Sequence, residues 1–312
     1  LAVEIDEEER FPWESVAKFA RYGMMGIPIP KKYGGAGGDN LMYCIAIEEI
    51  AKKCATSSVI IAAHTSLCMG PIMAFGTEEQ KMKWIPDLAS GRKIGAFGLT
   101  EPGAGTDASG QQTQAVKDGD EYVLNGTKCF ITNGDTADTY VVFAVTDKTK
   151  GLKGISLFVV EKGTPGFSTG LHEKKMGIRG SSTTDLIFED CRIPAGNLIG
   201  KEGQGWKICM HTLNGARAGV AAQALGIGEG ALDLAMKYVQ ERMQFKKKLS
   251  KFQRTQFEIA DMHTKLEAGK LLVYSAACKE DAYNKGDKTQ NYAMDSAMAK
   301  LFCGEAASDV TR

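Results

Sequence analysis

Short β-strand signals are confined to the middle of this chain, and helical patterns lie on both sides of them. The strand-like apolar runs are Tyr122–Leu124, Cys129–Thr132, Thr139–Thr146, Ile155–Val160 and Leu186–Phe188. The dipeptides Asn125-Gly126, Asn133-Gly134 and Lys150-Gly151 punctuate these runs, and we interpret each as a turn. Short strands at this density favour a β-barrel or a β-sandwich.

Residues 1–95 carry helical patterns. Asp39 and Asn40 can cap a helix over residues 41–53, whose apolar side chains lie near one face. The segment Ser57–Phe75 is apolar on nearly all sides, which predicts a buried helix. Thr77 and Gln80 have the spacing of a capping box, which predicts a helix start. We therefore predict an N-terminal helical domain.

The helical pattern returns at Gly205 and continues to the last residue. Trp206–Arg242 is one long candidate helix that contains Gly215, Gly219, Gly226, Gly228 and Gly230. Each glycine costs about 1 kcal/mol relative to alanine in a helix, so we expect another backbone or a ligand to pack against that face. Phe252–Tyr283 and Asp295–Val310 follow across a short link, which predicts antiparallel neighbours in a bundle.

These patterns predict an α+β multidomain fold. An N-terminal helical domain covers residues 1–95, a middle β-barrel or sandwich domain covers 96–200, and a C-terminal helical bundle covers 201–312. The last helical pattern reaches Arg312 without a stop signal, and the chain begins with Leu1. We therefore expect both ends to be cut and the bundle to be incomplete.

Charge and cysteine content argue against several classes of function. Lys plus Arg and Asp plus Glu balance at 38 each, which gives no electrostatic signature of nucleic-acid or acidic-membrane binding. The eight cysteines form no C-x-x-C pair, and with four histidines they predict no metal site. Unpatterned thiols suit a reducing compartment. Without a run of about eighteen apolar residues or a signal peptide, we expect no membrane insertion.

Two loops rich in Gly, Thr and Asn give the strongest functional signal. The first loop is Thr100–Gly110 (TEPGAGTDASG), and the second loop is Lys128–Gly134 (KCFITNG). Glycine allows a positive φ and a close approach of a ligand to the main chain. Thr hydroxyls and free backbone N–H groups supply donors for a planar, anionic cofactor. We therefore expect the two loops to form two walls of one site.

Two other interpretations of the first loop remain open. Residues 103–108 fit the dinucleotide fingerprint G-x-G-x-x-A, which requires a helix to begin at the glycines. Residues 109–117 are polar and β-leaning instead, and no amphipathic helix follows. The loop could also simply turn the chain between two strands.

The order of helical, β and helical parts, together with several motifs, resembles an acyl-CoA dehydrogenase over the whole chain. Besides the two loops, the motifs are Lys175–Thr183, Phe188–Pro194 and Arg242–Phe245. The stretches His64–Cys68 and Ala221–Glu229 are most similar to the short-chain, butyryl-CoA branch from anaerobic bacteria. The resemblance implies a flavoprotein that uses FAD to convert a short-chain acyl-CoA to the trans-2-enoyl-CoA. It also implies that an electron-transferring flavoprotein accepts the electrons.

The resemblance implies the binding residues as well. FAD would be held by Phe97, Leu99, Thr100, Gly105, Thr106, Phe130, Ile131 and Thr132. The FAD of a neighbouring subunit would be reached by Arg242, Gln244, Phe245, Leu249, Phe252 and Gln253. The acyl-CoA would be contacted by Thr106, Ser181, Asn214 and Arg217.

Plainer roles remain open for four of these residues. Phe130 and Ile131 could be strand core, and Arg242 could be a solvated cation at a helix end. Arg217 could form an intramolecular salt bridge.

Three positions depart from the family pattern. Lys246 stands where Gly is usual, Asn214 where Asp is usual, and Ala216 where a minority of relatives carry the catalytic Glu. The Tyr-Glu-Gly-Thr motif that usually carries the base does not occur before Arg312. We therefore assign no catalytic residue here, expect the general-base Glu beyond Arg312, and expect the chain as given to be inactive.

Glu101 and Asp107 are the other acidic residues of the first loop, and we expect both to bond nearby backbone. Two further functions stay open: an enoyl-CoA reductase on the same scaffold, and a non-catalytic flavin- and CoA-binding assembly partner. The family analogy implies a homotetramer, with no nucleic-acid partner and no metal. It places the protein in a bacterial cytoplasm, or in the mitochondrial matrix of a eukaryote.

Overall fold

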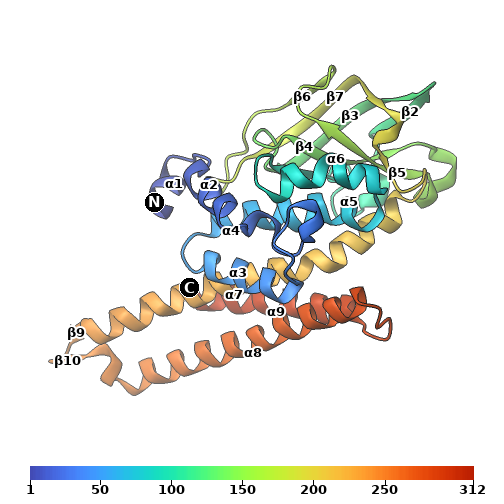
Figure 1. Ribbon diagram of the computed structural model, residues 1–312. Coiled ribbons are helices and arrows are strands. Elements are labelled where there is room, and N and C mark those ends of the chain that lie inside the picture. The colour runs from blue at the N-terminus through green and yellow to red at the C-terminus, as the bar shows by residue number, and fades with distance from the viewer. The chain divides into compact units, whose positions relative to one another are not determined.

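The computed structural model describes Leu1–Arg312 (Figure 1). Its residues pack as two units. Unit 1 contains Leu1–Gly38 and Ile60–Leu213, and unit 2 contains Asp39–Val59 and Asn214–Arg312. Helix α3 (Asn40–Ala51) therefore packs with the C-terminal helices. The domain boundaries at 95/96 and 200/201 stay a prediction.

The helices of unit 1 begin with α1 (Ala2–Glu7) and α2 (Trp13–Arg21). Helix α6 (Glu78–Ala89) begins with the predicted capping box: Gln80 N–H donates to Thr77 Oγ1 at 3.2 Å, and Thr77 N–H donates to Gln80 Oε1 at 2.9 Å. These two bonds satisfy two backbone N–H groups at the N-terminus of the helix, which have no acceptor within the helix itself.

The predicted buried helix over Ser57–Phe75 is confirmed, with one difference in its middle. Helix α4 (Ala55–Ala62) continues through a π-helical segment, Ala63–Met69, into α5 (Gly70–Phe75). By length and composition this helix could cross a membrane, but 61% of its most apolar window is buried inside the protein. A buried core helix of a globular protein has the same composition.

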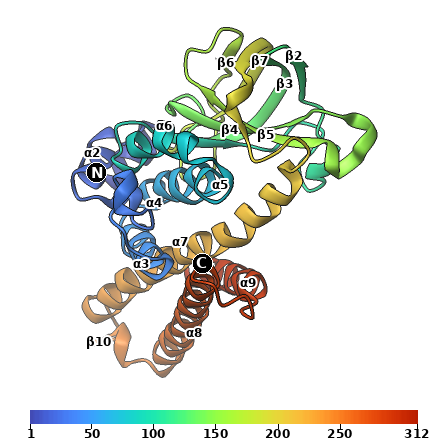
Figure 2. The ribbon, with the colours of Figure 1, turned by 45° about the vertical axis from the view of Figure 1, so that its right-hand side comes forward.

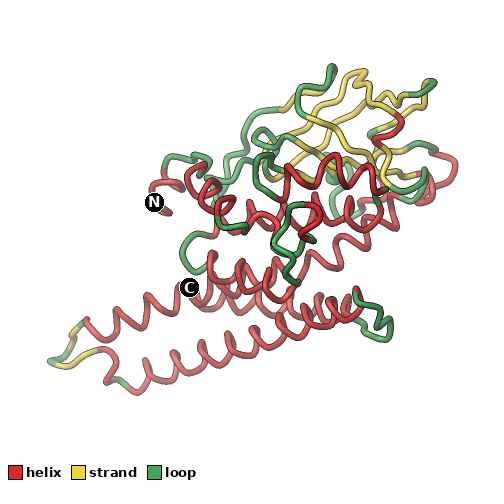
Figure 3. The backbone as a smooth tube through the Cα atoms, viewed as in Figure 1, coloured by secondary structure: helices red, strands yellow, loops and turns green.

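The middle of the chain forms one eight-stranded sheet (Figure 3). Its strands are β1 (Gly95–Gly98), β2 (Gln114–Asp118), β3 (Glu121–Thr132), β4 (Thr139–Val145), β5 (Ile155–Glu161), β6 (Phe167–Thr169), β7 (Thr183–Pro194) and β8 (Leu198–Ile199). The order is β6-β7-β3-β2-β4-β5-β8, and β1 pairs in parallel with β4. Buried Phe143 and Leu157 share one apolar cluster with Ile72, Trp84 and Leu88 of α5 and α6.

The interpretation of Asn125-Gly126 as a turn is wrong. Both residues lie inside β3, where the pairing with β7 shifts register between Leu124 and Gly126. Gly126 has a φ of 143°, and a Cβ there would lie 2.6 Å from Thr113 Oγ1, so the position requires glycine. The glycine marks a β-bulge, which bends the strand and continues it. Two predicted strands are therefore one.

Unit 2 is built from α3, most of α7 (Gly205–Glu241), α8 (Gln253–Asn284) and α9 (Tyr292–Val310). Helices α8 and α9 lie side by side and antiparallel, as predicted (Figure 2). Lys279 Nζ lies 2.6 Å from Asp295 Oδ1 between them. A two-residue hairpin, β9 (Met243–Gln244) and β10 (Lys247–Lys248), joins α7 to α8.

Two of the five glycines of α7, Gly226 and Gly230, pack as expected against another backbone, whereas Gly215, Gly219 and Gly228 first meet side chains. A Cβ at Gly226 would lie 2.2 Å from the carbonyl oxygen of Glu48, and one at Gly230 would lie 2.5 Å from that of Lys52. Both carbonyls belong to the C-terminal end of α3. The loss of helix propensity therefore allows α3 and α7 to approach each other closely.

Candidate active site

The first and second loops are joined edge to edge. β1 leads directly into the first loop, and the N–H of Cys129 in the second loop donates to the carbonyl oxygen of Thr100 at 2.9 Å. Asn133 Nδ2 donates to the carbonyl oxygen of Gly95 at 3.1 Å, which ties the second loop to the start of β1. The sequence prediction that the two loops share one site therefore agrees with their placement.

A second bulge in β3 directs Phe130 outward. The pairing of β3 with β7 shifts register between Lys128 and Ile131, and Phe130 has a φ of 58°. Its side chain is 62% exposed. A positive φ is costly for a bulky residue, and such strain concentrates at functional sites. The exposed ring excludes the interpretation of Phe130 as strand core, whereas Ile131, at 2% exposure, is core.

The first loop leaves its main chain open. Nothing lies within 4 Å of a Cβ built at Gly103 or Gly105, and Thr106 is exposed. Asp107 accepts a hydrogen bond from Ser109 N–H at 3.2 Å, as expected for an acidic residue in a tight turn. An exposed stretch with two glycines gives a ligand access to the backbone N–H groups.

Glu101 also bonds nearby backbone, as expected. Its Oε2 accepts from Gln112 N–H at 2.5 Å, and its Oε1 accepts from Thr113 N–H at 3.0 Å. Its third partner was missed by sequence reasoning: Lys128 Nζ lies 2.7 Å from Glu101 Oε1. No local pattern around Glu101 or Lys128 signals this pair in the sequence.

The other predicted wall residues of unit 1 are more buried than Phe130 and the open glycines. Leu99 is 9% exposed, and the ring of Phe97 packs edge-on against Phe143 with centroids 5.2 Å apart. Thr100 and Thr132 are half-buried. These residues therefore form a packed floor from which Phe130 and the open glycines project.

Ser181 lies next to the second loop. Asn133 N–H donates to the carbonyl oxygen of Ser182 at 2.8 Å, which places the segment before β7 beside the end of β3. Ser181 Oγ and Asn133 Oδ1 are buried and have no hydrogen-bond partner within the chain. Buried polar atoms without a partner are uncommon, and such atoms suit the polar groups of a ligand. Two polar atoms without a partner within the chain therefore lie where the segment before β7 meets the second loop.

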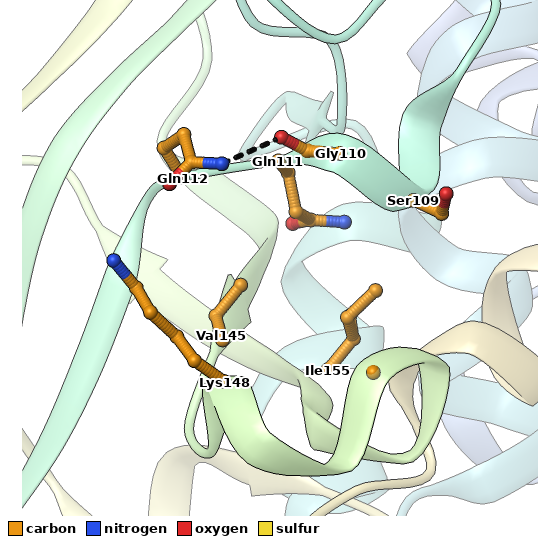
Figure 4. Close-up of a pocket in the computed structure, with 8 residues that line it drawn as sticks. Ser109, Gly110, Gln111, Gln112, Val145, Lys148 and Ile155 are labelled. Carbon is orange, nitrogen blue, oxygen red and sulfur yellow. Dashed lines mark hydrogen bonds between the residues drawn. The ribbon is translucent and has the colours of Figure 1, made fainter.

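A cavity of about 200 Å³ opens at the far end of the first loop (Figure 4). Ser109, Gly110, Gln111 and Gln112 line one side of it, and Val145, Lys148, Gly151 and Ile155 line the other. Gln111 is 3% exposed, and its Oε1 accepts from Lys128 Nζ at 3.1 Å. The cavity wall is therefore connected to the base of both loops.

The remaining predicted site residues lie in unit 2. Arg217 Nη1 donates to Asn214 Oδ1 at 2.5 Å, and Arg217 takes part in no ion pair. The predicted alternative of an intramolecular salt bridge for Arg217 is therefore wrong. Asn214 can hold the guanidinium in place and leaves its charge available to an anion.

The hairpin between α7 and α8 carries the other predicted residues. Arg242, Gln244, Phe245 and Gln253 are exposed, and Phe245 is 86% exposed. Leu249 and Phe252 are half-buried, and Lys247 Nζ lies 4.1 Å from the centroid of the Phe252 ring. An aromatic ring this exposed at a hairpin tip suits a contact outside the chain.

The sequence matches three domain families in succession. Residues 1–92 match the acyl-CoA dehydrogenase N-terminal domain, residues 96–191 its middle domain, and residues 203–312 its C-terminal domain. The chain is 57% identical over 311 residues to the short-chain specific acyl-CoA dehydrogenase of Clostridium acetobutylicum, which covers 100% of this chain and 80% of that protein.

Two further relatives bear on function. The chain is 52% identical to the acryloyl-CoA reductase (NADH) of Anaerotignum propionicum over 100% of its own length and 78% of that protein. A chain in the solved structure of the electron transferring flavoprotein of Acidaminococcus fermentans, which addresses flavin-based electron bifurcation, superposes with a TM-score of 0.95 at 52% identity. That match covers 98% of this chain and 79% of the other. The chain belongs to the acyl-CoA dehydrogenase family.

Proposed function

We propose that this protein is an FAD-dependent short-chain acyl-CoA dehydrogenase, which converts an acyl-CoA thioester to the trans-2-enoyl-CoA. The observation that carries the proposal is the junction of the two loops at the Thr100–Cys129 hydrogen bond. There, exposed Phe130 and the open Gly103 and Gly105 form a surface that a planar cofactor can contact.

The reaction needs a proton removed from Cα and a hydride removed from Cβ. The thioester carbonyl makes the Cα proton acidic, and a carboxylate base must take it while the hydride leaves. Bound FAD supplies the two-electron acceptor for that hydride. The chain's own residues bind and orient the cofactor and the acyl-CoA, and they exclude water from the site.

In this proposal the flavin wall consists of Phe97, Leu99, Thr100, Gly105, Thr106, Phe130, Ile131 and Thr132. The packed floor of Leu99 and Ile131 excludes water from the redox centre, and the Thr hydroxyls supply donors. Ser181 and Thr106 are proposed to contact the acyl-CoA. Asn214 and Arg217 are also proposed to contact acyl-CoA, because the Arg217 guanidinium forms no ion pair within the chain and suits an anionic group of CoA.

The proposed contact to the FAD of a neighbouring subunit is made by the hairpin. Arg242 can pair with a pyrophosphate, and Phe245 is 86% exposed and so accessible to another chain. The proposed contact residues also include Gln244, Leu249, Phe252 and Gln253. A contact to the FAD of a neighbouring subunit requires a homo-oligomer, and we propose a homotetramer.

Neither acidic residue of the first loop is free to act as the general base. Within the first loop, Glu101 is committed to Lys128 and two backbone N–H groups, and Asp107 is committed to Ser109. Position 216, the alternative place for the base, is Ala. We accordingly propose no general base from the first loop or from position 216.

The proposed electron acceptor is an electron-transferring flavoprotein. The high structural similarity to a chain in the Acidaminococcus structure supports this partner. The relatives come from bacteria and, in the mammalian examples, carry mitochondrial names. A bacterial cytoplasm, or the mitochondrial matrix for a eukaryotic source, is the proposed location.

The test is a rapid-mixing experiment on full-length protein loaded with FAD, without oxygen. Butyryl-CoA should bleach the visible flavin absorbance, and crotonyl-CoA should restore it after chemical reduction. If neither ligand changes the absorbance, the short-chain assignment fails. A full-length protein without a Glu in the C-terminal segment would instead favour a non-catalytic assembly partner.

The reverse reaction is the second candidate. Its support is the 52% identity to a protein named acryloyl-CoA reductase (NADH). The same site can serve either direction, because the residues that stabilise one transition state stabilise its reverse. Steady-state rates with reduced and oxidised electron-transferring flavoprotein would decide which direction is faster at equal substrate concentration.

A further inference from the structure

Lys128 is a fully buried lysine that the proposed chemistry does not use. Its side chain is 0% exposed, and its Nζ donates three hydrogen bonds. The acceptors are Glu101 Oε1 at 2.7 Å, Gln111 Oε1 at 3.1 Å and the carbonyl oxygen of Leu99 at 3.2 Å. An ammonium has three protons, so each of them has a partner.

These acceptors all belong to the first loop or its edges, whereas Lys128 belongs to the second loop. Leu99 and Glu101 flank Thr100 at the start of the first loop, and Gln111 follows its end. One side chain of the second loop therefore holds both ends of the first loop. The adjacent Cys129–Thr100 backbone hydrogen bond lies in the same junction.

Glu101 closes the first loop on itself. Its carboxylate accepts from the N–H groups of Gln112 and Thr113, which follow the loop, while its own backbone pairs with Ala104. Glu101 is 5% exposed, so water competes little for these bonds. The carboxylate thus fixes the span of the first loop, and Lys128 fixes the distance from that loop to the second.

Both groups are charged at neutral pH. Burial lowers the pKa of the Lys128 ammonium to about 8, while the Glu101 carboxylate partly offsets this effect. Burial alone would raise the pKa of Glu101, but the Lys128 charge and the Gln112 N–H lower it overall. A buried ion pair often contributes little net stability relative to apolar residues of similar size. Stability alone is therefore a poor explanation of this pair.

We propose that Glu101 and Lys128 are a positioning pair that sets the spacing between the two loops of the flavin wall. The inference rests on the proposed function, because it assigns the fixed spacing to cofactor binding. Neither residue touches the reacting atoms. The pair acts through Leu99, Thr100 and Phe130, whose relative places depend on the junction that it holds.

The test compares two variants of the full-length protein. Lys128→Met removes the cation and leaves a buried carboxylate unpaired, so this variant should lose both thermal stability and FAD affinity. The double variant Glu101→Gln with Lys128→Met removes both charges at nearly constant volume. It should recover part of the stability, because no unpaired charge remains buried, although the Gln amide oxygen can replace only one of the two carboxylate oxygens that accept from the Gln112 and Thr113 N–H groups.

The FAD affinity of the double variant distinguishes positioning of the loops from simple charge balance. If the pair positions the loops, its FAD dissociation constant should remain about tenfold or more above that of the unmodified protein, since the ionic bonds between the loops are gone. If the pair only balances charge, FAD affinity should return with stability, and this result would overturn the proposal. Exposed Lys174 and Glu189 give the matched control, Lys174→Met with Glu189→Gln, which should leave both quantities unchanged.

Hydrogen exchange in the flavin-free protein gives an independent readout. In the double variant, the N–H groups of Gln112, Thr113 and Cys129 should exchange about tenfold faster or more, because the junction opens more often. Unchanged exchange at all three would overturn the proposal. Because this measurement needs no flavin, it tests the pair even if the unmodified protein fails to bind FAD, which would refute the proposed function instead.

Discussion

The Nδ1 atom of His64 accepts a hydrogen bond from the backbone N–H of Gly95 at 2.9 Å, where β1 begins. Its Nε2 lies 3.1 Å from the carbonyl oxygen of Leu88, so the ring is neutral and Nε2 donates. Both contacts are buried, and His64 lies in the π-helical segment beneath the sheet. The imidazole therefore links the core helix to the strand that leads into the first loop.

This contact predicts a loss of stability in mild acid. Burial lowers the pKa of His64 from 6.5 to about 4. Below pH 6.5 the unfolded chain takes up a proton that the folded protein excludes, so stability falls until about pH 4 and by about 3 kcal/mol in total. Urea unfolding between pH 7.5 and 4 measures this loss.

The control is His64→Gln, whose amide can keep both hydrogen bonds without titrating. The free energy of unfolding of the variant should fall less steeply over the same pH interval. Its slope should be smaller than that of the unmodified protein by about 1.4 kcal/mol per pH unit. Equal slopes for the variant and the unmodified protein would show that His64 does not carry the effect.

Much of the fold was predictable because its signals are local or periodic. The long helices α7 and α8 follow from uninterrupted helical patterns, and the start of α6 follows from Thr77 and Gln80. The five glycines of α7 also indicated a close backbone neighbour. Sequence could not identify that neighbour as α3, because their contact joins segments far apart in the chain.

The site was predictable in part. Gly, Thr and Asn clusters located both loops, but the Asn125-Gly126 bulge was mistaken for a turn because bulges and turns favour the same residues. Lys128 was missed as an interacting residue. Its burial depends on acceptors supplied by Leu99, Glu101 and Gln111, which no pattern around position 128 reveals.

The close packing of α3 on α7 predicts that Gly226→Ala destabilises the protein. Alanine gains about 1 kcal/mol of helix propensity, but its Cβ would lie 2.2 Å from the Glu48 carbonyl oxygen, a backbone atom that cannot rotate away. We expect a net loss of about 2–3 kcal/mol in urea unfolding from such overpacking.

Gly304→Ala is the matched control, because it lies in α9 with nothing within 4 Å of its Cβ position. This change should stabilise the protein by about 0.5–1 kcal/mol. A change in the free energy of unfolding that has the same sign for both variants would contradict the packing argument.

The hairpin tip predicts that Lys246→Gly stabilises its local structure. Phe245 and Lys246 have φ values of 50° and 60°, a backbone conformation that costs about 1 kcal/mol or more per non-glycine residue. The Leu249 N–H donates to the Arg242 carbonyl oxygen at 2.9 Å and reports hairpin opening. Its hydrogen exchange should slow by about fivefold in the variant.

Lys248→Gly serves as the comparison, because Lys248 has a φ of −64° and an extended backbone. Glycine there relieves no strain and adds flexibility to the unfolded hairpin, so exchange at Leu249 should become faster. Slower exchange in both variants would mean that loss of a lysine charge, not relief of strain, causes the change.

A buried charge cluster in unit 2 predicts strong coupling between α3 and α8. Glu48 is 1% exposed; its Oε1 lies 3.3 Å from Lys270 Nζ, and its Oε2 accepts from Tyr274 Oη at 2.8 Å. Lys270 Nζ also lies 2.6 Å from Glu229 Oε1, and Lys52 Nζ lies 2.9 Å from Glu229 Oε2. Lys52 Nζ also lies 2.6 Å from Oε1 of exposed Glu49. The two less exposed acids, Glu48 and Glu229, are thus balanced by Lys52 and Lys270, and removing Glu48 or Lys270 breaks that balance.

Glu48→Gln should therefore lower the free energy of unfolding by about 3 kcal/mol, and Lys270→Met should lower it by a similar amount. The double variant should lose less than the sum of the two, because it leaves the balanced pair of Lys52 and Glu229. Urea unfolding of all four proteins gives the coupling energy, which we expect to be at least about 1.5 kcal/mol. Additive losses would mean that the two side chains contribute independently, and that the short distances between these charges carry no coupling across the helices.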